Sequence, residues 1–209
     1  MATAIAPPPE LTSDEAVVDL TTPEFFAMIE AGFFPPDRRV FLWNGRLCEK
    51  MAKTAAHATT SVAIHQALTR RLPDGWLLWP ENPIALDARH APLPDVTIVR
   101  GPLSRFVAER RHPAPGDVGL IVEIAVSSLP RDLGERAEKF ARALVPRYWV
   151  ADVRGGTIVE HSDPEIVEGV GHYALVKSRS PGEEIVLVLD GRAVAGLAVA
   201  ELLPWSAER

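Results

Sequence analysis

One carboxylate interrupts the most apolar segment of the chain. Residues 120–126 have the sequence LIVEIAV, in which the acid is Glu123. A short apolar run of this kind predicts a strand that is buried on both faces. An unpaired charge in such a strand is energetically costly. The pattern therefore predicts that Glu123 has a partner, which is a cationic side chain, a metal ion or a bound proton.

The remaining chain alternates between strand-like and helix-like patterns. Clusters of β-branched and aromatic residues predict strands at 40–43, 46–49, 76–79, 84–86, 96–99, 148–151, 157–160, 173–177 and 184–189. Caps and apolar residues at helical spacing predict helices from Thr22 to Gly32 with Thr22 as the N-cap, at 55–72 and at 132–144, with a closing helical turn at 199–202. Residues 104–116 are expected to form a loop with at most a short helical turn. The region 120–151 is then a strand–helix–strand unit, which is the basis of a parallel strand pair.

These elements predict an α+β protein. We expect one domain, residues 21–205, with a mixed β-sheet around a βαβ core, flanked by helices and extended by extra β-hairpins. A chain of 209 residues can bury a sizeable core for one such domain. Residues 1–20, which contain three consecutive prolines, predict a flexible leader.

Composition narrows the classes of protein to consider. The single cysteine, Cys48, excludes an internal disulfide framework and a cysteine-based zinc site, and it fits a cytoplasmic location. Apolar runs are too short to cross a membrane, so we expect no membrane partner. The net charge of −6 argues against bulk binding of nucleic acid. Residues 100–150 nevertheless hold nine Lys or Arg and six Asp or Glu, which is compatible with phosphate contact or with scattered solvated charges.

A second acid, Asp95, stands at the start of the expected strand 96–99. If the two strands are neighbours, Asp95 and Glu123 can hold a hard divalent cation that assists phosphodiester hydrolysis. Two structural alternatives remain open: Asp95 as a turn residue after Pro94, and Glu123 as the partner of a buried Arg136. Glycine-rich phosphate loops, Gly-x-Ser-x-Gly and His-Glu-x-x-His are absent, which argues against the enzyme classes that use them.

Several short motifs follow one another in a recognisable order. They are NGRLCEKM at 44–51, a histidine at 57, PD at 94–95, VEI at 122–124, RDLGE at 131–135, FA at 140–141 and VPRYWVAD at 145–152. Between Thr22 and Pro204, this order resembles the Uma-type family of predicted bacterial endonucleases. The resemblance implies the restriction-endonuclease-like fold of the PD-(D/E)XK superfamily.

The resemblance also implies a function. It indicates an Mg²⁺-dependent (or Mn²⁺-dependent) endonuclease that hydrolyses phosphodiester bonds, with DNA as the expected partner. Asp95 and Glu123 correspond to the metal-binding acids, whereas Glu49 and His57 correspond to residues that line the same cleft. By analogy with the fold class, a homodimer would suit cleavage of both DNA strands.

The chain departs from the family pattern at the residue expected to contact the phosphate. Arg136 stands where the family has a lysine, four residues before Phe140. Arginine keeps the positive charge but does not exchange a proton near neutral pH. Lys139 shares a helix face with Arg136 and is the other candidate. An alternative function is therefore a catalytically impaired nucleic-acid-binding protein of the same fold, and a third is a metal-dependent hydrolase of a small phosphorylated substrate.

Overall fold

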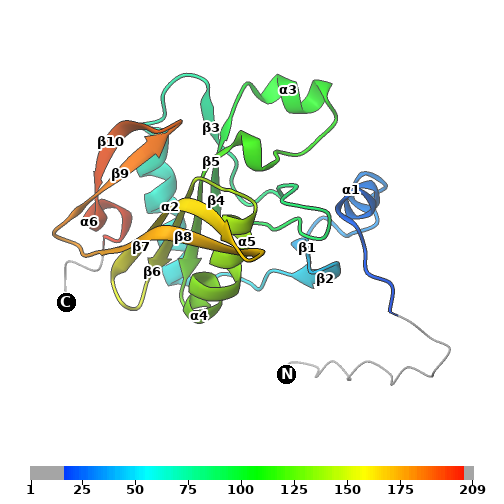
Figure 1. Cartoon of the computed structure of the whole chain (residues 1–209), viewed down its shortest axis with the longest axis horizontal. Helices are drawn as coiled ribbons and strands as arrows, with labels where there is room; N and C mark the ends of the chain where they lie inside the picture. Colours follow the sequence, from blue (N-terminus) through cyan, green and yellow to red (C-terminus); the bar gives the residue numbers. More distant parts are fainter. Residues whose placement is uncertain (1–16, 205–209) are drawn as a thin grey trace.

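A mixed β-sheet forms the centre of the computed structural model, which describes residues 17–204 (Figure 1). Its six strands lie in the order β3-β4-β5-β6-β7-β8. Their bounds are β3 Trp76–Leu78, β4 Val96–Arg100, β5 Val118–Ala125, β6 Arg147–Asp152, β7 Thr157–Val167 and β8 Val170–Arg179. Strands β5 and β6 are parallel and every other neighbouring pair is antiparallel. The predicted mixed sheet with a βαβ core is confirmed.

Strand β5 is buried on both faces, as its apolar sequence predicts. One face packs against α2 (Ala55–Thr69), α6 (Val199–Leu202) and the hairpin of β9 (Glu184–Leu189) and β10 (Arg192–Ala198). The opposite face packs against α5 (Ala137–Arg142). Ile121 and Ala125 belong to the α5 side, so the alternation of a strand places Glu123 on that side as well.

The crossover from β5 to β6 is a helical segment with a π-helical turn. It consists of α4 (Leu129–Arg131), the π turn η2 (Asp132–Arg136) and α5. The structure therefore begins this helix three residues earlier than predicted and ends it two residues earlier. A π turn widens the helix locally and is often found at functional sites. Here it buries Asp132 and Arg136 on the side of the helix that faces the sheet.

A separate two-stranded sheet precedes the central one. It consists of β1 (Val40–Trp43) and β2 (Arg46–Glu49), joined at Asn44 and Gly45. Both turn residues have positive φ angles, 52° and 75°, which confirms the predicted Asn-Gly hairpin turn. This hairpin and α1 (Thr22–Glu30) lie on the right in Figure 1, away from the β9–β10 hairpin. The N-cap of α1 is Thr21 rather than the predicted Thr22.

Several other predicted elements differ from the structure. Residues 84–86 form no strand, and the predicted loop 104–116 contains α3 (Leu103–Ala108) and the start of a short 3₁₀ turn, η1 (Pro115–Asp117). Strand β10 was not predicted because its alanine-rich sequence lacks a clear alternation of apolar and polar residues. Strands β7 and β8 are longer than predicted because they pair along a hairpin that extends beyond the predicted runs.

The predicted leader at 1–20 lies outside the described residues except for 17–20, so the domain boundaries stay a prediction. Leu20 donates a backbone hydrogen bond to the carbonyl of Gly45. Within the part of the chain that the structure describes, no helix has the length and apolar character needed to cross a membrane.

Candidate active site

Strands β4 and β5 bring the two predicted acids together. Val96 pairs with Val122, and the antiparallel register continued by one residue places Asp95 opposite Glu123. The backbone N–H of Ile124 donates a 2.8 Å hydrogen bond to Asp95 Oδ2. Both acids are buried, with 1% of Asp95 and 2% of Glu123 exposed. The structure thus forms the carboxylate pair that the sequence predicts for neighbouring strands.

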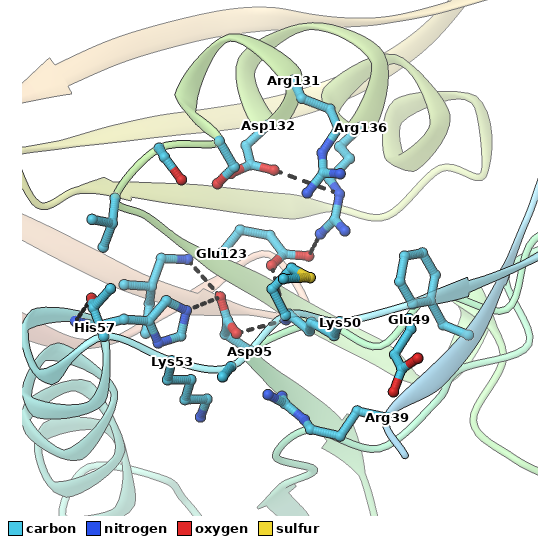
Figure 2. Close-up of a pocket in the computed structure, with 18 residues that line it drawn as sticks. Arg39, Glu49, Lys50, Lys53, His57, Asp95, Glu123, Arg131, Asp132 and Arg136 are labelled. Carbon is cyan, nitrogen blue, oxygen red and sulfur yellow. Dashed lines mark hydrogen bonds and ion pairs between the residues drawn. The ribbon is translucent and has the colours of Figure 1, made fainter. Parts of the chain in front are cut away.

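A lysine that the sequence analysis missed lies between these acids. Lys50 directly follows β2, and its Nζ lies 2.6 Å from Asp95 Oδ1 and 3.6 Å from Glu123 Oε2. The same ammonium group donates a 2.9 Å hydrogen bond to the carbonyl of Leu93. Figure 2 shows Lys50 extending toward Asp95 from the segment that follows the hairpin. The only signal in the sequence was the place of Lys50 within the motif that also contains Glu49.

His57 approaches Asp95 from the other side. It lies in the first turn of α2, where Thr54 caps the helix through a hydrogen bond from the His57 backbone N–H. His57 Nε2 is 3.2 Å from Asp95 Oδ2. The other ring nitrogen, Nδ1, is buried and has no hydrogen-bond partner among residues 17–204. The Nε2 contact orients the Asp95 carboxylate, and both residues line the same pocket.

Arg136 is the second cation in contact with the acids. It projects from the π turn, and its guanidinium donates a hydrogen bond to Glu123 Oε1. Its Nε lies 3.5 Å from Asp132 Oδ1. Arg136 and Glu123 are both almost fully buried. The structure therefore contains the buried ion pair that was the structural alternative for Glu123.

The two neighbouring carboxyl groups have different proton affinities. Burial raises the pKa of Asp95, but the hydrogen bond from His57 and the charge of Lys50 outweigh burial and hold this pKa well below its usual value. Burial raises the pKa of Glu123 to about 7, although the charges of Arg136 and Lys50 lower it. The surroundings therefore favour the ionised form of Asp95 and disfavour the ionised form of Glu123.

Two predicted site residues occupy other positions. Glu49 lines the edge of the pocket, but its carboxylate points away from the acids (Figure 2) and pairs with Arg38 at the surface. Lys139 forms an ion pair with Glu138 and lines a different pocket, next to the β1–β2 hairpin. The helix turns Lys139 away from Glu123, so Lys50, rather than Lys139, supplies the lysine beside the acids.

The pocket around these residues has a volume of about 220 Å³. Its cationic lining residues are Arg39, Lys50, Lys53, Arg131 and Arg136. Arg39 and Lys53 both pair with Glu81, and Arg131 is exposed. Positive charges around a pair of acids attract an anionic substrate toward the place where a cation would be held.

The oxygen atoms around the Lys50 ammonium group are of the kind that a hard divalent cation prefers. The Asp95 and Glu123 carboxylates and the Leu93 carbonyl all lie around the Lys50 ammonium group. Mg²⁺ commonly uses one or two carboxylates and completes its coordination with water. Within residues 17–204, no group of three or more His, Cys, Asp or Glu side chains is arranged to hold a metal. A metal here would depend on these two carboxylates, backbone oxygen and water.

Comparisons with known proteins agree on the fold. The family model Uma2, described as "Putative restriction endonuclease", matches residues 22–200. The chain is also similar to the crystal structure of "a putative nuclease belonging to DUF820 from Anabaena variabilis ATCC 29413". That similarity has a TM-score of 0.59 at 12% sequence identity and covers 80% of this chain and 90% of the other. The search of curated proteins gave no match. The predicted restriction-endonuclease-like fold is confirmed.

Proposed function

The chain belongs to the Uma2 family of restriction-endonuclease-like proteins, and on this premise we propose that it is an Mg²⁺- or Mn²⁺-dependent endonuclease that hydrolyses phosphodiester bonds in DNA. The observation that carries the proposal is the pair of buried acids, Asp95 and Glu123, in a pocket lined by cations. This arrangement combines oxygen ligands for a hard cation with positive charge for a phosphate.

Each residue has a definite part in this proposal. Asp95 and Glu123 would hold the divalent cation, which when bound polarises a phosphate and lowers the pKa of a water molecule. His57 holds the Asp95 carboxylate in position through its Nε2 contact. Exposed Arg131 lies at the edge of the pocket, where it would attract and orient the phosphate backbone.

Metal-dependent nicking of supercoiled plasmid DNA tests the function. The purified protein should convert plasmid to the open-circular form in Mg²⁺ or Mn²⁺ and not in EDTA. Asp95→Asn and Glu123→Gln remove one candidate ligand each and should lower the rate by at least about 100-fold, by analogy with the loss of other essential electrostatic groups. Circular dichroism checks that both variants are folded.

Asp190→Asn provides a matched control for these substitutions. Asp190 is an exposed acid in the β9–β10 turn, and its φ of 51° is a conformation that asparagine tolerates. This variant should nick at the wild-type rate. Equal residual nicking by wild type, Asp95→Asn and Glu123→Gln would show that a contaminating nuclease is responsible. Hydrolysis of p-nitrophenyl phosphate without nicking would favour a small phosphorylated substrate.

A second candidate function is DNA binding without cleavage. It is favoured by the buried Arg136–Glu123 pair, because this pair neutralises one acid and leaves Arg136 without access to solvent. A gel-shift titration would then show retention of DNA that weakens as salt concentration rises, whether or not metal is present. Retention without nicking in Mn²⁺ would support this candidate over the nuclease.

Two further features belong to the proposal. A homodimer would place two sites on one duplex and allow cleavage of both strands. A cytoplasmic location would suit the single cysteine, Cys48, which is not in a disulfide bond.

A further inference from the structure

The Lys50 ammonium group occupies a place that suits a metal ion. It contacts one oxygen of Asp95 at 2.6 Å and the carbonyl oxygen of Leu93 at 2.9 Å, and Glu123 Oε2 lies 3.6 Å away. These are the oxygen atoms that a hard divalent cation would require. An ammonium group and a metal ion cannot share this position, because they would compete for the same lone pairs and repel each other at short distance.

We propose that Lys50 is a tethered cation that occupies the metal position and leaves it when a divalent ion binds. The proposal rests on the proposed function in one respect, namely that Asp95 and Glu123 are the metal ligands. It adds a residue that neither the sequence analysis nor the comparisons assign to the site. A divalent ion would then bind to this chain by replacing the Lys50 ammonium group between the two acids, and not by entering an empty site.

Lys50 is the cation of the site that can leave. It precedes residues 51–54, which form neither helix nor strand, and its side chain is 15% exposed toward the pocket. The next residue, Met51, is 83% exposed, so its side chain does not pack over Lys50. Arg136, in contrast, lies on a helical turn, is 3% exposed and contacts Asp132 as well as Glu123.

The displaced ammonium group would remain beside the reacting phosphate. The lysine side chain is flexible, and Lys50 lines the same pocket as Arg39 and Lys53. A substrate phosphate bound at the metal would therefore meet the Lys50 charge a short distance from the two acids. Lys50 would thus supply the pocket with a flexible lysine, which the chain lacks at position 136 because an arginine stands there.

Metal binding without nucleic acid tests the exchange directly. Mn²⁺ affinity would be measured by isothermal titration calorimetry and by electron paramagnetic resonance at pH 8. Lys50→Met removes the competing charge and keeps a side chain of similar length, so it should bind Mn²⁺ at least about tenfold more tightly than wild type. Lys50→Arg keeps a cation and should show no such gain.

Lys53→Met is the matched control, because Lys53 lines the same pocket but pairs with Glu81 instead of the two acids. Its Mn²⁺ affinity should stay within about twofold of the wild-type value, since its charge is already paired with Glu81 and is screened by salt. An equal gain in Mn²⁺ affinity in Lys50→Met and Lys53→Met would show that the loss of any nearby positive charge is sufficient. That result would overturn the proposed exchange. So would an affinity of Lys50→Met equal to that of wild type, or the absence of Mn²⁺ binding to either.

A measurement on the wild-type protein covers the case in which Lys50→Met does not fold. Acetylation by acetic anhydride, followed by peptide mass spectrometry, reports the accessibility of each lysine. Mn²⁺ should increase the acetylation rate of Lys50 severalfold and leave that of Lys177 unchanged. An unchanged or lower rate at Lys50 would contradict the proposal. If the acetylation result contradicts the exchange, metal-dependent nicking would still support the nuclease function. A failure of the exchange is therefore distinguishable from a failure of the proposed function.

Discussion

At the scale of single residues, the site is defined by how its charges are balanced. Two carboxylates of one strand pair face two cations, and each acid has its own principal partner: Lys50 for Asp95 and Arg136 for Glu123. A fully buried acid on a central strand cannot remain ionised without such a partner. Arg136 thus lowers the pKa of Glu123 and offsets part of the increase that burial causes.

Arg136→Met tests this role through stability. Removing one partner of a buried ion pair leaves an uncompensated charge, so the variant should lose about 3–5 kcal/mol of unfolding free energy at pH 8. The loss should be smaller at pH 5, because Glu123 has a pKa of about 7 and can take up a proton there. Urea unfolding followed by tryptophan fluorescence gives both values.

The double variant Glu123→Gln/Arg136→Met provides the control for this measurement. It removes both charges. Its loss of unfolding free energy should be smaller than the sum of the losses in the two single variants, because each single variant leaves one buried charge without a partner. A loss below about 1 kcal/mol for Arg136→Met at pH 8 would show that the pair does little for stability.

At the scale of elements, the sequence predicts the helices, strands and turns that depend on residues close together in the chain. The apolar run of β5, the Asn-Gly hairpin and the strand–helix–strand unit all follow from residues near one another in the chain, and the structure has them. The same reasoning indicated that Asp95 and Glu123 would form a site if their strands were neighbours, and the structure pairs these strands. It also named Arg136 as a partner for Glu123, because a buried acid requires a cation.

The sequence did not reveal which residues far apart in the chain lie close together in the fold. Lys50 reaches Asp95 because β1 bridges the segment before β4 at Leu42 and Ala91, and no local pattern relates residue 50 to residue 95. The π turn was missed for a similar reason, since a helical pattern does not reveal one extra residue within a turn. Lys139 lies in α5, beyond the π turn, and pairs with Glu138 instead of Glu123.

The segment that leads into β5 offers a test of pH dependence. Asp117 accepts hydrogen bonds from Arg105, from Arg111 and, at 3.0 Å, from the backbone N–H of Ala114. Burial raises the pKa of Asp117, but the hydrogen bond from Arg111 and the other partners outweigh it and lower this pKa below the usual 3.8. Asp117 therefore contributes stability above pH 3.8, which is lost as the pH falls through its lower folded-state pKa.

Asp117→Asn should accordingly destabilise the protein by about 2 kcal/mol at pH 7. The difference from wild type should shrink below pH 3.8, where the unfolded Asp117 carboxyl is already protonated. Chemical unfolding at pH 7 and at pH 3 measures it. Glu109→Gln is the control, since exposed Glu109 also pairs with Arg111 and should contribute less than about 1 kcal/mol. A constant difference at both pH values would contradict the assignment.

At the scale of the whole molecule, the sheet has an exposed edge. Strand β8 is the last strand of the sheet, and the second half of it is exposed on both faces. Leu175 and Val176 are 48% and 55% exposed there. An open strand with apolar side chains is a template for pairing with another strand. If the protein forms the proposed homodimer, β8 is the edge at which we expect the two copies to meet.

Val176→Lys tests this surface by adding a charge to each copy of the paired edge. Like charges across paired strands are unfavourable, so the variant should sediment as a monomer at concentrations where wild type is a dimer. Val107→Lys, at an exposed apolar position on α3, should leave the dimer intact. Sedimentation velocity distinguishes these outcomes. A wild-type monomer, or a dimer that persists in Val176→Lys, would contradict this interface.

The origin of Lys50 outside the central sheet has an evolutionary consequence. The two acids belong to strands whose residues build the core, whereas Lys50 comes from the exposed connection between a peripheral hairpin and α2. A substitution at position 50 would therefore change the affinity of the site for cations without replacing any side chain of the central sheet. Proteins that share this sheet would differ in cation affinity through this one connecting segment.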